Sequence, residues 1–447
     1  MGRLITYDNV VLESLNTLIK NKVVQTGLII GQSTPQKDIV LRLCPTPMKD
    51  EIEGEEDSLQ KSKQKTAAND IDESWICQHA KQLVRALPGG LDILGLYIVA
   101  PSDFTVKNQA LLRQVLFAIY KIKSLKGKIL RERILLNICS ITSKILCRTF
   151  DVSDYKSSAT PAEWKSQNGP QKWHRLRCHL AVDVKFPHKK AEINNLSLLT
   201  QMELSLKNFF ENIQNAVLLF NGQKRNMDDA LAISVEGKRS KKKQSERTEH
   251  LSEWFDVELF IPLGNDVISS PEIFTATSMM TFRGIMQCRA YIHAKATVQE
   301  AVDAIKQDIA RSLISRCEIH CEDLLLIEEE QSDPLVVHEL PRRVFAPLPQ
   351  MDVCVCDYQF HNDAASDSLD AFKELLNLEL TEEDIDTSCE VSPTTRALIL
   401  PDAAEDKLSE FGDAPVQSSS MRLAPIIGVV STIAVGLTAY VIKTQWS

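Results

Sequence analysis

The chain has 447 residues, 44% of them hydrophobic and 25% charged, which is the composition of a globular protein rather than a disordered or fibrous one. A chain of this length predicts two or three domains. The formal net charge is −9, so no overall attraction to phosphate groups is expected, and we expect no nucleic acid partner.

The N-terminus, MGRLITYDNVVLESL, has no long apolar core and no small-residue cleavage site, so it does not predict a secretory signal. Gly2 and Thr6 match the short myristoylation pattern, but the same residues are typical of the start of a hydrophobic strand, and the sequence leaves lipidation open. The eleven cysteines are odd in number and include no C-x-x-C pair, which favours reduced thiols of a cytosolic protein.

A first mixed α/β domain is predicted over residues 1–155. A charged insert at about 48–74 interrupts it and is expected to be disordered, because it has few large apolar residues to bury. The apolar run at 91–100, LDILGLYIVA, is typical of a strand buried on both faces. The other predicted elements are strands at 23–32 and 38–44 joined by a turn around Pro35, a helix at 73–87 ended by Pro88, Gly89 and Gly90, a helix at 106–122, and a hairpin of 133–140 with 144–152.

A second α/β domain is predicted over residues 156–380. Its predicted elements are strands at 173–186, 253–262, 281–294 and 342–360, with helices at 297–327 and 365–377. A loop at about 236–250 contains a lysine cluster at 238–243, which could be a nuclear signal or a nucleic-acid patch. Acidic neighbours favour a solvated loop instead.

The C-terminal part predicts a membrane anchor. Residues 381–421 are acidic and contain Pro393, Pro401 and Pro415, which is typical of a flexible stalk. The uncharged segment from Leu423 to Ile442, LAPIIGVVSTIAVGLTAYVI, would span roughly 30 Å as a helix, the thickness of the hydrocarbon core of a bilayer. A buried core helix is the alternative, but it is usually shorter and seldom lies at the end of a chain. We therefore predict a single-pass, tail-anchored protein with the bulk of the chain in the cytosol.

The stretch DILGLYIVAPSDF at 92–104 resembles the central strand of the MPN/JAMM fold, whose active members read G-W-Y-H-S-H-P there. Gly95, Tyr97 and Pro101 match this frame. The resemblance implies a zinc site of two histidines and an aspartate beside a glutamate. The corresponding four positions hold Val24, Ile98, Ala100 and Leu111. None of these side chains can bind zinc, which needs a nitrogen, thiolate or carboxylate donor. We therefore expect an MPN-like pseudoenzyme domain with no catalytic residue, no metal and no cofactor.

Two cysteine motifs are candidate metal sites. Cys317 and Cys321 in CEIHC lie one helical turn apart, so they could form half of a zinc site, but no second pair is evident and packing thiols are favoured. Cys354 and Cys356 in VCVCDY share one face of a strand, and core packing is the simpler interpretation.

Several long stretches together resemble the odorant response abnormal protein 4 homologues. They lie between residues 26 and 360, and are TGLIIGQSTPQKDIV, LPGGLDILGLYIV, CRTFDVSDYKSSATPAEWK, LFNGQ, QCRAYIHAKATVQEAVDAIKQDI, RCEIHCEDLLL and LPRRVFAPLPQMDVCVCDYQF. The predicted tail anchor agrees with this family.

The resemblance implies a protein of the endoplasmic reticulum membrane that helps odorant receptors and other G-protein-coupled receptors reach the cell surface. It also implies a partnership with the cysteine protease specific for the ubiquitin-fold modifier, which the adaptor brings to the membrane. Two alternatives remain: an isopeptidase-like enzyme with an unrecognised cysteine nucleophile, and a membrane tether without specific partners.

Overall fold

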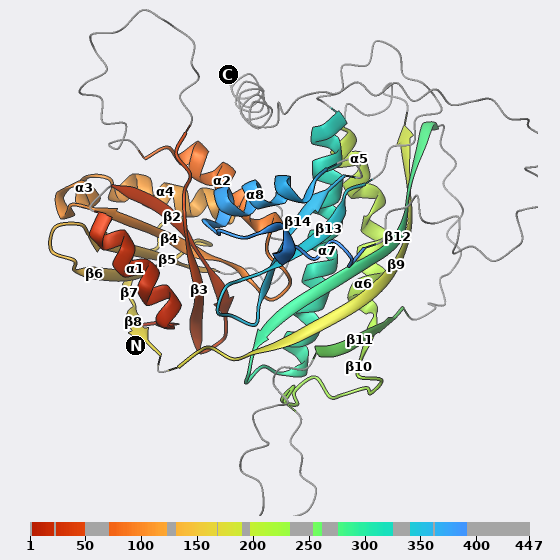
Figure 1. Cartoon of the computed structure of the whole chain (residues 1–447), viewed down its shortest axis with the longest axis horizontal. Helices are drawn as coiled ribbons and strands as arrows, with labels where there is room; N and C mark the ends of the chain where they lie inside the picture. The colour runs from red at the N-terminus through yellow and green to blue at the C-terminus, as the bar shows by residue number, and fades with distance from the viewer. Residues whose placement is uncertain are drawn as a thin grey trace, which may run out of the picture.

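The structure is a computed structural model. It describes residues 2–21, 24–49, 71–122, 131–167, 169–189, 197–232, 254–261, 276–324, 340–360 and 363–390. These residues form a mixed α/β protein with one large mixed sheet and two smaller sheets (Figure 1).

Eight strands form the first sheet, in the order β7-β6-β5-β4-β2-β3-β1-β8. Their bounds are β1 Leu4–Tyr7, β2 Gln25–Ser33, β3 Lys37–Pro45, β4 Asp92–Ala100, β5 Glu132–Cys139, β6 Ile145–Asp151, β7 Thr160–Pro161 and β8 Glu163–Ser166. The pairs β2–β3 and β5–β6 are antiparallel, so both predicted hairpins are confirmed, whereas β4 and β5 run parallel.

Strand β4 lies in the middle of this sheet, and all 9 of its residues are buried, which confirms the prediction for residues 91–100. Ile93, Leu96 and Ile98 enter one hydrophobic core, whereas Tyr97 and Val99 enter the core on the opposite face. Both faces of the strand are covered, and its sequence is therefore apolar without alternation.

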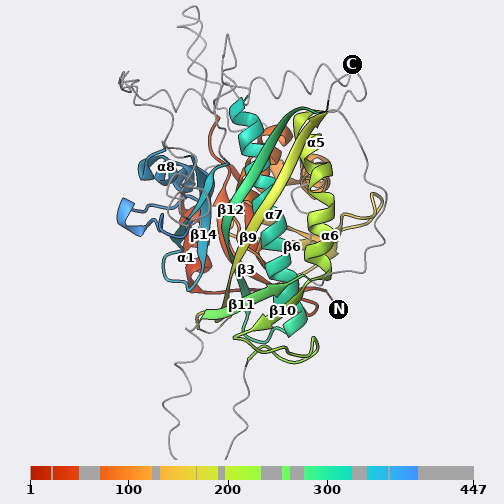
Figure 2. The same cartoon turned by 90° about the vertical axis from the view of Figure 1, so that its right-hand side faces the viewer.

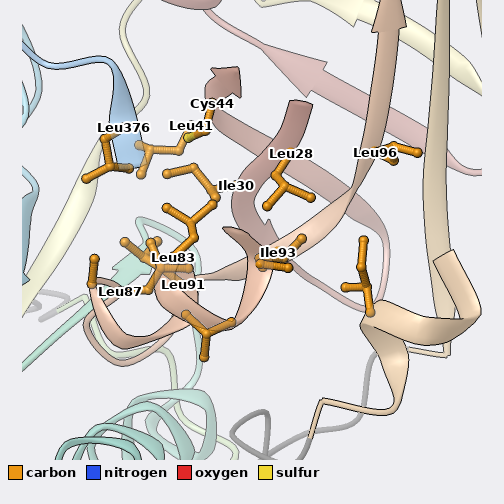
Figure 3. Packing of buried hydrophobic residues seen from close by; sticks show 14 of the residues in the cluster. Leu28, Ile30, Leu41, Cys44, Leu83, Leu87, Leu91, Ile93, Leu96 and Leu376 are labelled. Atoms are coloured by element: carbon orange, nitrogen blue, oxygen red, sulfur yellow. The ribbon is translucent and has the colours of Figure 1, made fainter. Parts of the chain in front are cut away.

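Helices cover both faces of the first sheet. Helix α1 (Asn9–Asn21) packs Val11 and Leu15 against one face, and Asp8 caps it by accepting from the backbone N–H of Val10 and Val11. The other face carries α2 (Glu73–Arg85), capped by Asp72, and α4 (Gln109–Tyr120). Figure 3 shows leucine and isoleucine side chains of β2, β3, β4 and α2 meeting in this core, with Leu376 arriving from much later in the chain.

The helix predicted at 106–122 is confirmed as α4, but its predicted start is wrong, because α4 begins three residues later. The structure has a short helix α3 (Ser102–Lys107) followed by α4, and the two are separated at Asn108. The Asn108 side chain donates to the carbonyl oxygen of Phe104 at 3.0 Å, so it closes the first helix locally. Short polar side chains that bond to nearby backbone compete with helix continuation in this way.

The second sheet has four strands in the order β10-β11-β9-β12. Their bounds are β9 Trp173–Lys189, β10 Val217–Phe220, β11 Trp254–Phe260 and β12 Ala276–His293. The long antiparallel pair β9–β12 dominates the sheet. Figure 2 shows α5 (Leu198–Ser205), α6 (Lys207–Asn215) and α7 (Val298–Leu324) on one side of this pair, where they enclose a second core.

The strand predicted at 342–360 is also wrong as a single element. It is a hairpin of β13 (Arg342–Pro347) and β14 (Cys354–Gln359), with a turn in which Gln350 has a φ of 64°. Pro347 and Pro349 interrupt backbone hydrogen bonding here, because proline has no N–H to donate. The hairpin and α8 (Ala365–Leu376) pack onto the first core, and a short 3-10 helix, η3 (Glu382–Asp384), follows.

The prediction that one domain ends at residue 155 stays a prediction. In the structure, the first sheet continues to β8, and residues from 342–378 pack into the hydrophobic core beside that sheet. Residues 381–390 were predicted as part of a flexible stalk, but they pack against the fold. Asp386 forms an isolated β-bridge with Phe345, and the Glu390 side chain is buried. Most of the predicted insert, the lysine-rich loop, the rest of the stalk and the anchor from Leu423 to Ile442 lie outside the described residues. Among the described residues, no helix is long and apolar enough to cross a membrane.

Candidate functional site

Three of the four positions that the MPN resemblance assigns to metal ligands contribute to the first core. Ile98 and Ala100 on β4 are completely buried, and Val24 packs against the same cluster. Leu111 is half-buried on α4 and lies outside this cluster. The structure thus brings three of the four positions together, and each carries only hydrocarbon. In the described part of the chain, no three His, Cys, Asp or Glu side chains are grouped to hold a metal ion.

The eleven cysteines are free thiols, and six of them are buried. Burial raises the pKa of Cys44 and Cys77 to about 12 and that of Cys356 to about 11. Cys356 is buried on β14 and Cys354 is half-buried against the first core, as expected for packing residues. A thiol with a raised pKa is protonated at neutral pH and is a poor nucleophile.

Cys139, at the end of β5, differs from these thiols. Hydrogen bonds from the side chain and backbone of Thr142 and from the backbone of Ile141 lower its pKa to about 7. The backbone N–H of Thr142 lies 3.5 Å from Cys139 Sγ. Sequence analysis did not single out this residue. The only signal was its place before a Ser-x-Thr turn between two strands.

The main polar feature of the interior is a junction between the two larger sheets, centred on Asp308 of α7. Both oxygens of this carboxylate accept from the guanidinium of Arg343 on β13, at 2.7 and 3.0 Å. They also accept from the backbone N–H of Gly89, at 2.8 Å, and of Arg289, at 3.0 Å. Asp308 and Arg343 are both fully buried. Burial of an ion pair is tolerated only when its hydrogen bonds are satisfied, and this carboxylate accepts four.

A loop that follows α2 fits into this junction. Arg311 of α7 donates to the carbonyl oxygens of Leu87 and Leu91, both at 3.0 Å. Gly89 lies so close to α7 that an added Cβ would be 2.1 Å from the carbonyl oxygen of Ala304. The Pro-Gly-Gly sequence that ends α2 is therefore required for close approach of the loop to α7 as well as for the turn.

Two further ion-pair groups hold the junction on either side. Arg85 of α2 bonds to Glu318 and Glu322 of α7, which ties the two helices together. The carboxylate of Glu390 accepts from Arg316 at 2.7 and 2.8 Å. It also accepts from the backbone N–H groups at Gln287 and Arg343, at 2.9 and 2.8 Å. The last described residue is therefore fastened to α7, β12 and β13 together.

A small pocket opens at the edge of the junction. It has a volume of about 70 Å³ and is lined by residues that include Gln32, Gly90, Asp92, His293, Glu300 and Gln307. Ligand pockets are usually about 300–1,000 Å³, so this one suits a few water molecules rather than a substrate. The junction thus joins the two larger sheets through buried ion pairs and hydrogen bonds.

Comparison with known proteins places the chain in a family. The model of the family described as odorant response abnormal 4-like matches residues 27–387. The protein odr-4 homolog of Mus musculus is 33% identical over 456 residues, which is 98% of each chain. The chain belongs to the ODR4-like family. The human odr-4 homolog is also 33% identical over 98% of each chain.

More distant relatives share the same region. The odorant response abnormal protein 4 of Caenorhabditis elegans is 23% identical over 382 residues, covering 83% of this ODR4-like chain and 77% of that protein. Among solved structures, the crystal structure of UfSP from C. elegans aligns with a TM-score of 0.42 and 8% identity. The alignment covers 85% of this chain and only 57% of that one.

The residues that build the junction of this ODR4-like protein were not predicted. The apolar stripe of the long helix was recognised, but Asp308, Arg311 and Arg316 lie off that stripe and would normally face solvent. They are buried because α7 is enclosed on nearly all sides. A helix with buried residues around its whole circumference is typical of the centre of a protein, and its partners cannot be read from periodicity.

Proposed function

We propose that this ODR4-like protein is a non-enzymatic adaptor of the endoplasmic reticulum membrane. It supports the trafficking of G-protein-coupled receptors, odorant receptors among them. It also recruits the ubiquitin-fold-modifier-specific cysteine protease to that membrane. Family membership supports the receptor role, since the C. elegans relative carries the name odorant response abnormal protein 4. The protease partnership rests on what the family resemblance implies.

The non-enzymatic part of the proposal rests on one observation: the positions assigned to metal ligands by the MPN resemblance carry apolar side chains. Ile98 and Ala100, at the positions of the two zinc-binding histidines, are fully buried in the first core. A polar ligand could not replace them without burying unsatisfied donors, which costs about 1–3 kcal/mol each. The domain is therefore suited to binding another protein by its surface.

Membrane attachment is supported by the segment from Leu423 to Ile442, which is uncharged and long enough to span a bilayer. The folded part would then lie in the cytosol, where cysteines remain reduced. Its two sheets, held at one rigid junction, give a receptor or a protease a fixed surface to bind.

Co-purification from membranes tests the adaptor role. We expect the full chain, extracted in mild detergent, to carry the protease at a stoichiometric ratio and to resist alkaline washing of the membranes. A chain that ends at Ser420 should move to the soluble fraction and should no longer enrich the protease on membranes. The measurement is quantitative mass spectrometry of both fractions.

The matched control replaces residues 423–442 with an unrelated tail-anchor helix, which should restore membrane enrichment of the protease. Failure of this chimera, or retention of the truncated chain after the alkaline wash, would contradict the proposed role of the tail. Co-purification of neither receptors nor the protease would favour a tether without specific partners.

The alternative, an isopeptidase with a cysteine nucleophile, has one structural candidate. Cys139 has a pKa lowered to about 7, so about half of it is thiolate at neutral pH. We expect iodoacetamide to label Cys139 before the other thiols, with a rate that rises with pH and reaches half its maximum near pH 7. Mass spectrometry of labelled peptides measures this, with Cys77 as the slow internal reference.

Reactivity alone does not make an enzyme. We expect purified wild-type protein to leave ubiquitin-fold-modifier conjugates intact. Cleavage that is lost in Cys139→Ser and kept in Cys77→Ser would overturn the adaptor interpretation in favour of the enzyme.

A further inference from the structure

Three sulfur-bearing side chains from two helices, Cys317, Cys321 and Met202, lie near the C-terminal end of α7. Cys321 Sγ lies 3.6 Å from Met202 Sδ of α5. Cys317 precedes Cys321 by one helical turn, so the two thiols share a face of α7. Burial first, and then the neighbouring Cys321 thiol, raise the pKa of Cys317, which places the two cysteines within electrostatic reach of each other.

Local structure explains why the third sulfur is there. Met202 is the buried residue of α5 and is 1% exposed. Its helix packs beside α7 in both views of the molecule (Figures 1 and 2). Cys317 is likewise 1% exposed, whereas Cys321 is half-buried. The cluster therefore has two shielded sulfurs and one that is accessible from the surface.

We propose that Cys317, Cys321 and Met202 form a binding site for one Cu(I) ion. Soft thiolate and thioether ligands select Cu(I) over harder divalent cations. A trigonal site with metal–sulfur bonds of about 2.3 Å has sulfur atoms about 4 Å apart. The Cys321–Met202 pair needs to open by only a few tenths of an ångström to reach this separation. The site lies outside the adaptor role described above.

Zinc fits this cluster less well. Structural zinc sites are tetrahedral and take nitrogen, thiolate or carboxylate ligands. A thioether in the third position and a buried apolar surrounding favour a three-coordinate soft ion instead. Among the residues that the structure describes, no third His, Cys, Asp or Glu completes a zinc site with these two thiols.

Binding is an exchange of protons for the metal without a change of oxidation state. Cu(I) enters as Cu(I), two S–H bonds break, two Cu–S bonds form from the thiolates, and two protons leave to solvent. Met202 donates a lone pair and loses no proton. The site carries a net charge of −1 when occupied.

The surrounding charges modulate this exchange. Burial first, and then the neighbouring carboxylates of Glu322 and Glu318, raise the pKa of Cys321 to about 11. Glu203 follows Met202, and Arg85 and Lys81 pair with Glu322 on the opposite side. Because two S–H bonds break for each Cu(I) ion bound, binding releases protons and should weaken as the pH falls.

Competition with a coloured chelator tests the site. The probe is Cu(I) held by bicinchoninate under reducing, oxygen-free conditions, added to the full chain in mild detergent. We expect the protein to withdraw one equivalent of Cu(I), and X-ray absorption should show only sulfur neighbours at about 2.3 Å. Each of Cys317→Ser, Cys321→Ser and Met202→Leu should weaken binding at least tenfold.

The matched control is Cys77→Ser, which removes another half-buried helical thiol and should leave Cu(I) affinity unchanged. Met202→Leu keeps side-chain volume, and such swaps usually cost less than about 1.5 kcal/mol, so this variant should remain folded even where a cysteine variant does not. Equal losses in Cys77→Ser and the three ligand variants, or tighter binding of Zn²⁺ than of Cu(I), would overturn the proposal.

Discussion

At the scale of single residues, Gln32 shows how one side chain can join two sheets. Its Nε2 donates to the carbonyl oxygens of Gly90 and Tyr291, at 2.8 and 3.1 Å, and its Oε1 accepts from the backbone N–H of His293 at 2.8 Å. Gln32 belongs to the first sheet, whereas Tyr291 and His293 belong to β12 of the second. The three hydrogen bonds of this buried amide fix the position of β2 relative to β12, although these two strands are not paired with each other.

His79 makes the stability of the protein depend on pH. Burial lowers its pKa from 6.5 to about 4, and its Nε2 lies 3.0 Å from the carbonyl oxygen of Leu375 on α8. The folded protein holds this imidazole neutral, so between pH 6.5 and 4 the unfolded chain binds more protons. Stability from this group is therefore present at neutral pH and is lost as the pH falls through that window.

We expect wild type to lose up to about 3 kcal/mol of unfolding free energy relative to His79→Gln between pH 6.5 and 4. Urea unfolding at a series of pH values measures the difference between the two proteins. Asp357, whose pKa is raised to about 6 by burial, has the opposite slope, but it is present in both proteins and cancels. If the unfolding free energies of the two proteins changed equally with pH, His79 would not be held neutral in the folded protein.

At the scale of elements, sequence predicted those whose apolar pattern is complete by itself. Strand β4, both hairpins of the first sheet, β9, β11, α7 and α8 were found within a few residues. The elements α1, α5, α6 and β10 were missed, whereas β1 was anticipated as the start of a hydrophobic strand. Helix α5 buries only Met202, and β10 has four residues, so neither has enough local pattern to be distinguished from a loop.

The candidate site was predicted in part and for a similar reason. The burial of Ile98 and Ala100 followed from the continuous apolar run of β4, whereas their place at the ligand positions of an MPN frame stays a prediction. The junction around Asp308 could not be predicted, because its partners lie on α7, on β13 and in the loop after α2. Nothing in the local sequence of Asp308 distinguishes a buried, four-bonded carboxylate from one that faces water.

The contact between the loop after α2 and α7 gives a prediction at this scale. In Gly89→Ala the new Cβ would lie 2.1 Å from the carbonyl oxygen of Ala304 and 2.9 Å from Asp308 Cβ. The loop must move away from α7, and we expect a loss of about 1–3 kcal/mol, as is typical of overpacking. Thermal unfolding followed by circular dichroism measures it.

Gly284 on β12 is the matched control, because no atom lies within 4 Å of the Cβ that alanine would add. Gly284→Ala should be neutral or stabilising by about 0.5–1 kcal/mol, since glycine weakens a strand interior. A neutral Gly89→Ala would mean that the loop does not approach α7 this closely.

At the scale of the whole molecule, α7 holds the two larger sheets together, and Asp308 is its central contact. Asp308→Asn removes the charge that balances fully buried Arg343. Breaking one partner of a buried pair typically costs about 3–5 kcal/mol, and we expect a loss of this size. Urea unfolding of the full chain in mild detergent measures it.

Asp303→Asn is the control on the same helix, since Asp303 is exposed and should change stability by no more than about 0.5 kcal/mol. The double variant Asp308→Leu with Arg343→Met should recover only part of the loss, because it removes the unbalanced charge of Arg343 but also removes the acceptor of the Gly89 and Arg289 backbone N–H groups. A small effect of Asp308→Asn would instead mean that each sheet folds without support from the junction.

The place where the described chain ends has a mechanical consequence. Glu390 is fastened to Arg316 of the central helix and to the backbones of β12 and β13. With the tail embedded as proposed, a pull from the membrane would reach the fold at Glu390. The load would then pass to α7, β12 and β13 together rather than to a single strand.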